Sequence, residues 1–95
     1  MQIKRAASAG TLESCDIMIL LEEGQNGIEI DLKSTVEKQF GDQIKLVITK
    51  TLIDLGAASV KVVVNDRGAL DCTIKARVFA AYYRATDSKD YKWGE

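Results

Sequence analysis

The feature that most constrains the fold is a helix-spaced stripe of apolar residues in the middle of the chain. Its members recur at intervals of one, three or four: Val36, Phe40, Ile44, Val47, Ile48, Leu52 and Leu55. This spacing lines one face of a helix. Ser34 to Glu37 fits a capping box, and Gly56 stands where a left-handed residue commonly ends a helix. The pattern predicts one long amphipathic helix between these signals.

Two strands are predicted before this helix. Residues 16–22 are apolar on both faces and have the length of a strand. Gly24, Asn26 and Gly27 mark a turn, and residues 28–33 then alternate between apolar and charged, as a half-buried strand does. We expect these two runs to pair as a hairpin. Residues 1–10 lack periodicity and are expected to form an extended or mobile lead-in.

Two more strands are predicted after the helix. Residues 60–65 alternate around three valines, and residues 65–68 carry strong turn chemistry. Residues 70–78 alternate again, which favours a fourth strand, although the apolar residues there would also suit a helix. Residues 79–85 are expected to form either a short helix or a continuation, and residues 87–95 form a polar tail.

The predicted fold class is α+β. At 95 residues the chain (1–95) has the length of a single domain. The predicted order is strand, strand, helix, strand, strand, with a short C-terminal helix as the open alternative. A mainly antiparallel four-stranded sheet, covered on its apolar face by the one long helix, buries these patterns in a two-layer sandwich.

Composition and motif content exclude most catalytic classes. The chain has no histidine, so it lacks both imidazole metal ligands and the Ser-His or Cys-His pairs of nucleophilic catalysis. Cys15 and Cys72 lack metal-site spacing and are expected to be reduced, partly buried thiols. No glycine-rich phosphate loop occurs. We therefore expect no metal site and no enzymatic activity in the isolated chain.

Charge and hydropathy narrow the possible partners. Thirteen Lys and Arg residues against fourteen Asp and Glu residues give a net charge of -1, which argues against general nucleic-acid binding. The longest apolar run, Ile17–Leu21, is far shorter than the ~20 residues of a membrane-spanning helix. We expect a soluble, cytoplasmic protein that binds neither nucleic acid nor membrane.

Acidic and aromatic residues are unevenly distributed along the chain. Between residues 6 and 32 all charged residues are acids: Glu13, Asp16, Glu22, Glu23, Glu29 and Asp31. They form either a solvated strand edge that resists aggregation or a docking surface for a basic partner, and both readings stay open. Near the C-terminus, Phe79, Tyr82 and Tyr83 are expected to pack in the core. Tyr91 and Trp93 in the tail have no expected core role.

Ser14 lies between two carboxylates, those of Glu13 and Asp16, just before the first predicted strand. On physical grounds alone it reads as an ordinary surface serine. An unactivated hydroxyl is a poor nucleophile, and no internal base with a suitable pKa is evident in the sequence. If Ser14 reacts, another enzyme must perform the chemistry.

Several segments around and beyond Ser14 resemble the acyl carrier protein, or gamma subunit, of bacterial citrate lyase. The matching runs are A-G-T-L-E-S at 9–14, D-I-M at 16–18, K-Q-F-G-D at 38–42, T-L-x-x-L-G at 51–56, V-V-V-N-D-R-G-A-L-D-C at 62–72, A-R-V at 76–78 and A-A at 80–81. The resemblance extends over almost the whole chain. It implies a non-catalytic carrier that bears phosphoribosyl-dephospho-coenzyme A, attached covalently through a phosphodiester to Ser14.

The resemblance also implies partners and a reaction cycle. The arm ends in a thiol that carries an acetyl group. The citrate lyase alpha subunit exchanges acetyl for citryl and releases acetate, and the beta subunit cleaves the citryl thioester to oxaloacetate and restores the acetyl thioester. A separate prosthetic-group transferase installs the arm. A tethered substrate meets both active sites at high effective concentration.

One position departs from the resemblance: Cys15 stands where a second serine is more usual. Strand parity predicts that Cys15 points to the core, with Ser14 and Asp16 on the opposite face. Two alternative functions stay open at this point. One is an unmodified interaction module that uses the acidic N-terminal hairpin, and the other is the carrier of a related thioester-cycling decarboxylase.

Overall fold

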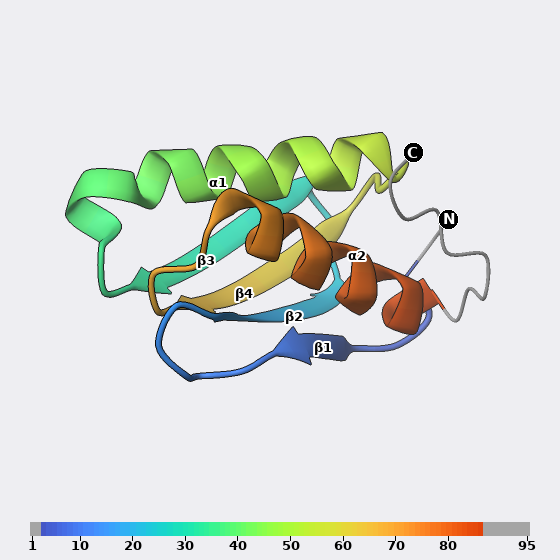
Figure 1. Cartoon of the computed structure of the whole chain (residues 1–95). Coiled ribbons are helices and arrows are strands. Elements are labelled where there is room, and N and C mark those ends of the chain that lie inside the picture. The colour runs from blue at the N-terminus through green and yellow to red at the C-terminus, as the bar shows by residue number, and fades with distance from the viewer. Residues whose placement is uncertain (1–2, 87–95) are drawn as a thin grey trace.

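Both helices lie on one face of a four-stranded sheet, so the molecule has two layers (Figure 1). The computed structural model describes residues 3–86. The elements follow in the order β1 (Ala7–Gly10), β2 (Ile17–Glu23), β3 (Ile28–Ser34), α1 (Glu37–Asp54), β4 (Val60–Asp66) and α2 (Asp71–Thr86). The predicted α+β two-layer class is confirmed, but the order of its elements is not. The predicted tail at 87–95, with Tyr91 and Trp93, lies outside the described residues.

The sheet is mixed, and the predicted hairpin does not form. The strand order is β1-β2-β4-β3, so β4 lies between the two runs that we expected to pair. β2 pairs antiparallel with both β1 and β4, whereas β3 pairs parallel with β4 in the register Ile28↔Val60. β2 therefore has a paired neighbour on both edges and is a central strand of the sheet.

A glycine allows the chain to leave β2 directly against the start of β4. A Cβ atom at Gly24 would lie 2.7 Å from the Val60 nitrogen, so the chain passes directly against the start of β4 as it leaves β2. The Val60 N–H donates to the Gly27 carbonyl oxygen at 3.0 Å. The turn-like residues 24–27 therefore lead around the end of β4, and the long connection through α1 allows β3 and β4 to run parallel.

Residues 7–10 form an edge strand, where a lead-in was expected. Ala7 pairs with Leu21 and Gly10 with Met18. A Cβ atom at Gly10 would lie 1.7 Å from the Ile17 carbonyl oxygen, so no side chain fits there. Small residues without alternation carry no strand pattern, and therefore sequence periodicity missed β1.

The prediction of a fourth strand over residues 70–78 is wrong, because α2 occupies this segment. Both edges of β4 are already paired with β2 and β3, so the following segment cannot add to β4 as a hairpin partner. Asp66 also accepts hydrogen bonds from the Gly68 and Ala69 N–H groups at 3.1 and 3.0 Å, which turns the chain away from the sheet. Ile74 and Val78 are buried with helical spacing, whereas Leu70 is 70% exposed.

Helix α1 confirms the predicted amphipathic stripe at its centre and departs from it at its start. Ile44, Ile48 and Leu52 are buried, but Phe40 is 51% exposed. Gly56 has the predicted left-handed conformation, with φ +83°. The capping box does not form: Val36 is the N-cap and no side chain caps the helix.

The core lies between the sheet and the two helices. Alternate residues of β2 and β4 point into it, together with the central residues of each helix. The buried apolar set comprises Ala9, Ile17, Ile19, Leu21, Ile44, Ile48, Leu52, Val60, Val62, Val64, Ile74, Val78, Phe79, Ala81, Tyr82, Tyr83 and Ala85. The three aromatic residues of α2 are thus buried as predicted, and Tyr82 belongs to the central core cluster. One long helix does not cover the sheet alone, because α2 packs over β1 and β2.

Candidate attachment site in the loop before β2

Ser14 lies in the loop at residues 11–16, which joins β1 to β2 (Figure 1). Its side chain is exposed. The β3–α1 and β4–α2 connections reach the same end of the sheet, because β2 starts where β3 and β4 end. The hydroxyl therefore stands at one tip of the domain, beside the starts of both helices.

Backbone hydrogen bonds hold the outer turn of this loop. The Cys15 N–H donates to the Arg67 carbonyl oxygen at 2.8 Å, and the Arg67 N–H donates to the Asp16 carbonyl oxygen at 2.9 Å. The Asp16 N–H donates to the Glu13 carbonyl oxygen at 3.2 Å. The turn that carries Ser14 is thus tied to the connection between β4 and α2.

The prediction that Cys15 faces the core is wrong. Cys15 is exposed, and its φ of +63° is left-handed, a conformation that residues other than glycine rarely adopt. β2 begins only at Ile17, so Cys15 precedes the part of the chain to which strand alternation applies. Cys72 is also exposed, so the expected partial burial of the two thiols is wrong, whereas both are free rather than paired, as expected.

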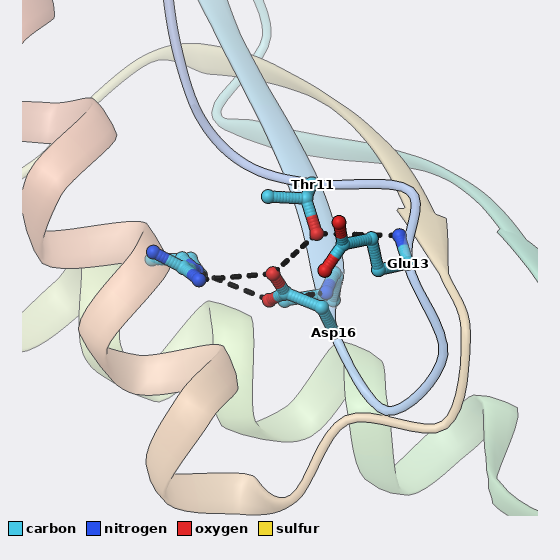
Figure 2. A network of polar contacts seen from close by, with 5 residues as sticks. Thr11, Glu13 and Asp16 are labelled. Carbon is cyan, nitrogen blue, oxygen red and sulfur yellow. Dashed lines mark hydrogen bonds and ion pairs between the residues drawn. The ribbon is translucent and has the colours of Figure 1, made fainter.

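The Asp16 carboxylate anchors the loop to its surroundings. The Thr11 Oγ1 donates to Asp16 Oδ2 at 2.6 Å and itself accepts the Glu13 N–H at 3.2 Å, as Figure 2 shows. The Ile17 N–H donates to Asp16 Oδ1 at 2.8 Å. From α2, the Arg77 Nε and Nη2 donate to the two carboxylate oxygens at 3.1 and 2.9 Å.

These hydrogen bonds set the protonation state of Asp16. The hydrogen bond from Arg77, followed by those from Thr11 and Ile17, lowers the pKa of Asp16 from its ordinary value of 3.8 to about 2. Such a carboxylate stays ionised at neutral pH and is a weak proton acceptor. Asp16 is therefore a poor candidate for a general base that would activate Ser14.

The residues of this end present an exposed hydroxyl, and the anchored Asp16 carboxylate beside it is a poor base. Among residues 3–86 no group of His, Cys, Asp and Glu side chains is arranged to hold a metal ion. An exposed serine on an anchored turn is suited to accept a group that another protein delivers. Thr11 and Arg77 were not singled out by the sequence. Their only signal was that each falls within a run that resembles the citrate lyase carrier.

The six acids of the N-terminal third do not form one surface. The Asp16 carboxylate is hydrogen-bonded within the 11–16 loop, to which Glu13 also belongs. Glu22 and Glu29 lie toward the opposite end of the sheet. There both are cross-strand neighbours of Lys61 on β4. Because β4 separates β2 from β3, the acidic hairpin of the interaction-module alternative does not exist as predicted.

No helix within residues 3–86 is long and apolar enough to cross a membrane.

The fold resembles that of one chain in a solved enzyme complex. A chain in the crystal structure of a Pseudomonas malonate decarboxylase hetero-tetramer in complex with malonate superposes with a TM-score of 0.70. The match covers 90% of this chain and 88% of that chain, at 21% sequence identity. At this identity the likeness concerns the fold alone.

Sequence comparison identifies the family. The family model described as malonate decarboxylase delta subunit (MdcD), an acyl carrier family, matches residues 4–85. The citrate lyase acyl carrier protein of Lacticaseibacillus casei (strain BL23) is 58% identical over 95 residues, which is 100% of this chain and 94% of that protein. That of Lactiplantibacillus plantarum is 57% identical over 93 residues, covering 98% of this chain and 97% of that protein. This chain belongs to the family of citrate lyase acyl carrier proteins, which are carrier subunits rather than catalysts.

Proposed function

We propose that this chain is the acyl carrier of citrate lyase and that its prosthetic arm, phosphoribosyl-dephospho-coenzyme A, is attached to the Ser14 Oγ. The observation that carries the proposal is the exposure of Ser14 on an anchored turn at the tip of the domain. The surrounding A-G-T-L-E-S run is the one that resembles the attachment motif of the family. A long covalent arm needs a hydroxyl with open space around it, and Ser14 meets this requirement.

The attachment step requires a second enzyme and an activated form of the arm. The Ser14 Oγ forms a bond to a phosphorus atom of a polyphosphate-activated precursor, and the bond from that phosphorus to its leaving group breaks. The leaving group departs with the bonding electron pair. The hydroxyl proton passes to a base of the transferase, because the nearest anchored carboxylate, Asp16, has a pKa of about 2. The product is a phosphodiester.

The partners follow from the same assignment. Once attached, the arm supplies a thiol that carries acetyl and citryl groups between the alpha and beta subunits of the lyase. The chain itself provides a rigid base for the arm, with Ser14 at one end and the core of the sheet behind it. Presentation of one tethered thiol to two active sites raises its effective concentration at each.

Intact mass tests the attachment directly. The chain is co-expressed with the transferase and the enzymes that make the precursor. Wild type is expected to gain the mass of the arm, and Ser14→Ala is expected to gain nothing. Ser59→Ala is the matched control, because Ser59 is also an exposed loop serine but precedes β4 at the other end of the sheet. If the wild-type chain keeps the mass of the unmodified protein, the proposal is wrong.

The fold likeness to a malonate decarboxylase chain keeps one second candidate in view. A carrier of such a decarboxylase would bear the same arm but serve a different substrate. Modified protein mixed with purified citrate lyase alpha and beta subunits and citrate is expected to yield oxaloacetate. If it instead supports malonate decarboxylation with the decarboxylase subunits and gives no oxaloacetate, the decarboxylase assignment replaces the citrate lyase one.

A further inference from the structure

One polar network joins the Ser14 loop to α2 without including Ser14 itself. The Asp16 carboxylate accepts two hydrogen bonds from the Arg77 guanidinium, one from Thr11 and one from the Ile17 N–H, at 2.6 to 3.1 Å. Thr11 and Asp16 lie on either side of Ser14 in the chain, and Arg77 is sixty-one residues from Asp16. A bidentate arginine–carboxylate pair of this kind is strong and strongly directional.

We propose that Arg77, Asp16 and Thr11 form a positioning clamp that holds the 11–16 loop in the one conformation that the prosthetic-group transferase accepts. This inference rests on the proposed attachment at Ser14 and assigns the residues that make Ser14 a good acceptor. The Thr11–Asp16 bond closes the loop across Ser14, and Arg77 fixes the closed loop to α2. None of the three side chains takes part in the transfer.

The conformation of the loop explains why a clamp is needed. Cys15 has a φ of +63°, and a left-handed residue that is not glycine persists only where its surroundings hold it. The clamp is partly shielded, with the side chain of Asp16 14% exposed and that of Arg77 38% exposed. Without it, the loop would populate several conformations, and the apparent affinity for the transferase would fall with the fraction that is competent.

Modification kinetics provide the first test. The kcat and KM of arm transfer are measured by intact mass for wild type, Arg77→Met, Arg77→Lys and Thr11→Val. The control is Arg84→Met, because Arg84 lies on the same helix but donates to the Ser8 carbonyl oxygen of β1 at 2.8 Å. Arg77→Met is expected to lower kcat/KM about tenfold through a higher KM at nearly constant kcat. Arg77→Lys should fall between it and wild type, and Arg84→Met should match wild type.

Amide hydrogen exchange at Cys15 provides a second readout that does not depend on transfer. This N–H is bonded to the Arg67 carbonyl oxygen at 2.8 Å, so it reports whether the turn is held. Its exchange is expected to accelerate in Arg77→Met and Thr11→Val and to stay slow in Arg84→Met. A merely structural role of Arg77 would lower the melting temperature without changing Cys15 exchange or KM in the folded protein.

The outcomes separate the two proposals. If Arg77→Met does not fold, Thr11→Val decides the matter, because it removes the 2.6 Å bond to Asp16 and the 3.2 Å bond from the Glu13 N–H but keeps the pair of Arg77 and Asp16. If Thr11→Val, Arg77→Met and Arg84→Met all have the same kcat/KM, the clamp proposal is wrong. Attachment at Ser14 is not affected by that result. A wild-type chain that is never modified overturns attachment at Ser14 and, with it, any role of the clamp in transfer.

Discussion

The two loops at the ends of β2 start alike and are then held by different means. Each follows a glycine with no room for a Cβ atom: Gly10, 1.7 Å from the Ile17 oxygen, and Gly24, 2.7 Å from the Val60 nitrogen. The loop at 11–16 is then fixed by backbone hydrogen bonds with Arg67 and, in addition, by charged and polar side chains, among them one from α2. The loop at 24–27 is fixed by close backbone packing and a single backbone hydrogen bond to β4.

This difference reflects what each loop does. The 24–27 loop only has to lead the chain around the end of β4, and steric fit is enough for that. The 11–16 loop has to turn a serine outward in a defined conformation, and an exposed turn has few apolar contacts that could define it. Backbone hydrogen bonds with Arg67 and side-chain hydrogen bonds, including those from α2, hold this conformation instead. Substitutions in the two loops should therefore have different effects, and the predictions below are ordered by expected size.

The largest effect is expected from Gly10→Ala. The added methyl group would overlap the Ile17 carbonyl oxygen, and the φ of +105° is unfavourable for alanine. We expect the free energy of unfolding to fall by about 3 kcal/mol or more, measured by urea denaturation. Gly68→Ala is the control, because its φ of +86° is also positive but open space surrounds it. A loss of only about 1 kcal/mol in both variants would mean that β1 moves aside easily.

Gly24→Ala should rank second, with a loss of about 2 kcal/mol in the free energy of unfolding. The new Cβ atom would meet the Val60 backbone at 2.7 to 2.9 Å, and backbone atoms in the sheet cannot rotate away as a flexible side chain can. Gln25→Ala, an exposed change in the same loop, should be nearly neutral in the same urea titration. If the two variants are equally stable, close packing does not hold this loop.

Because the ionised Asp16 carboxylate anchors the 11–16 loop, the contribution of this loop to the free energy of unfolding should depend on pH. The contribution of the 24–27 loop should not. Because the pKa of Asp16 falls from 3.8 to about 2 on folding, the unfolded chain binds more protons between these values. The stabilisation by the Asp16 charge is thus fully present above pH 4 to 5 and is lost as the pH falls toward 2. The urea midpoint of wild type should decline more steeply over this range than that of Asp16→Asn. Parallel curves would contradict an ionised anchor.

The smallest effect is expected from Cys15→Gly, and its sign is opposite. Glycine adopts a φ of +63° without strain, so the substitution relieves the left-handed conformation at the outer turn. Part of this gain is offset because glycine has more freedom in the unfolded chain. A net increase of about 0.5 kcal/mol in the free energy of unfolding is expected by urea denaturation. The control is Cys72→Gly, which should be destabilised because it places a glycine in the first turn of α2. A destabilised Cys15→Gly would mean that the thiol itself contributes contacts.

Elements with strong apolar periodicity were predictable, and elements defined by their neighbours were not. The stripe through Ile44, Ile48 and Leu52 identified α1, and the alternating valines identified β4. β1 escaped detection because small residues carry no periodic signal. The segment of α2 was misassigned because Ile74 and Val78 fit a strand and a helix equally well. Only the occupied edges of β4 exclude the strand.

The candidate attachment site was likewise predictable only in part. Ser14 was recognised from a run of residues that resembles a known family, and its exposure agrees with that role. The orientation of Cys15 was misjudged because strand parity was extended to a residue before β2 begins. Arg77 was missed because its contact with Asp16 spans sixty-one residues, and no local pattern reports a pair that far apart.

The amino-acid sequence by itself determined the α+β class, the central helix, the absence of histidine-based chemistry and the serine proposed to carry the arm. The first three properties depend on residue types and short spacings, which local physical rules can interpret, whereas the serine was recognised from the resemblance to a known family. The tertiary structure alone decided that β4 separates β2 from β3, that residues 71–86 are helical and that Arg77 reaches Asp16. Each of these depends on which surfaces and hydrogen-bonding edges remain free once the other elements have packed, and this competition is settled only in three dimensions.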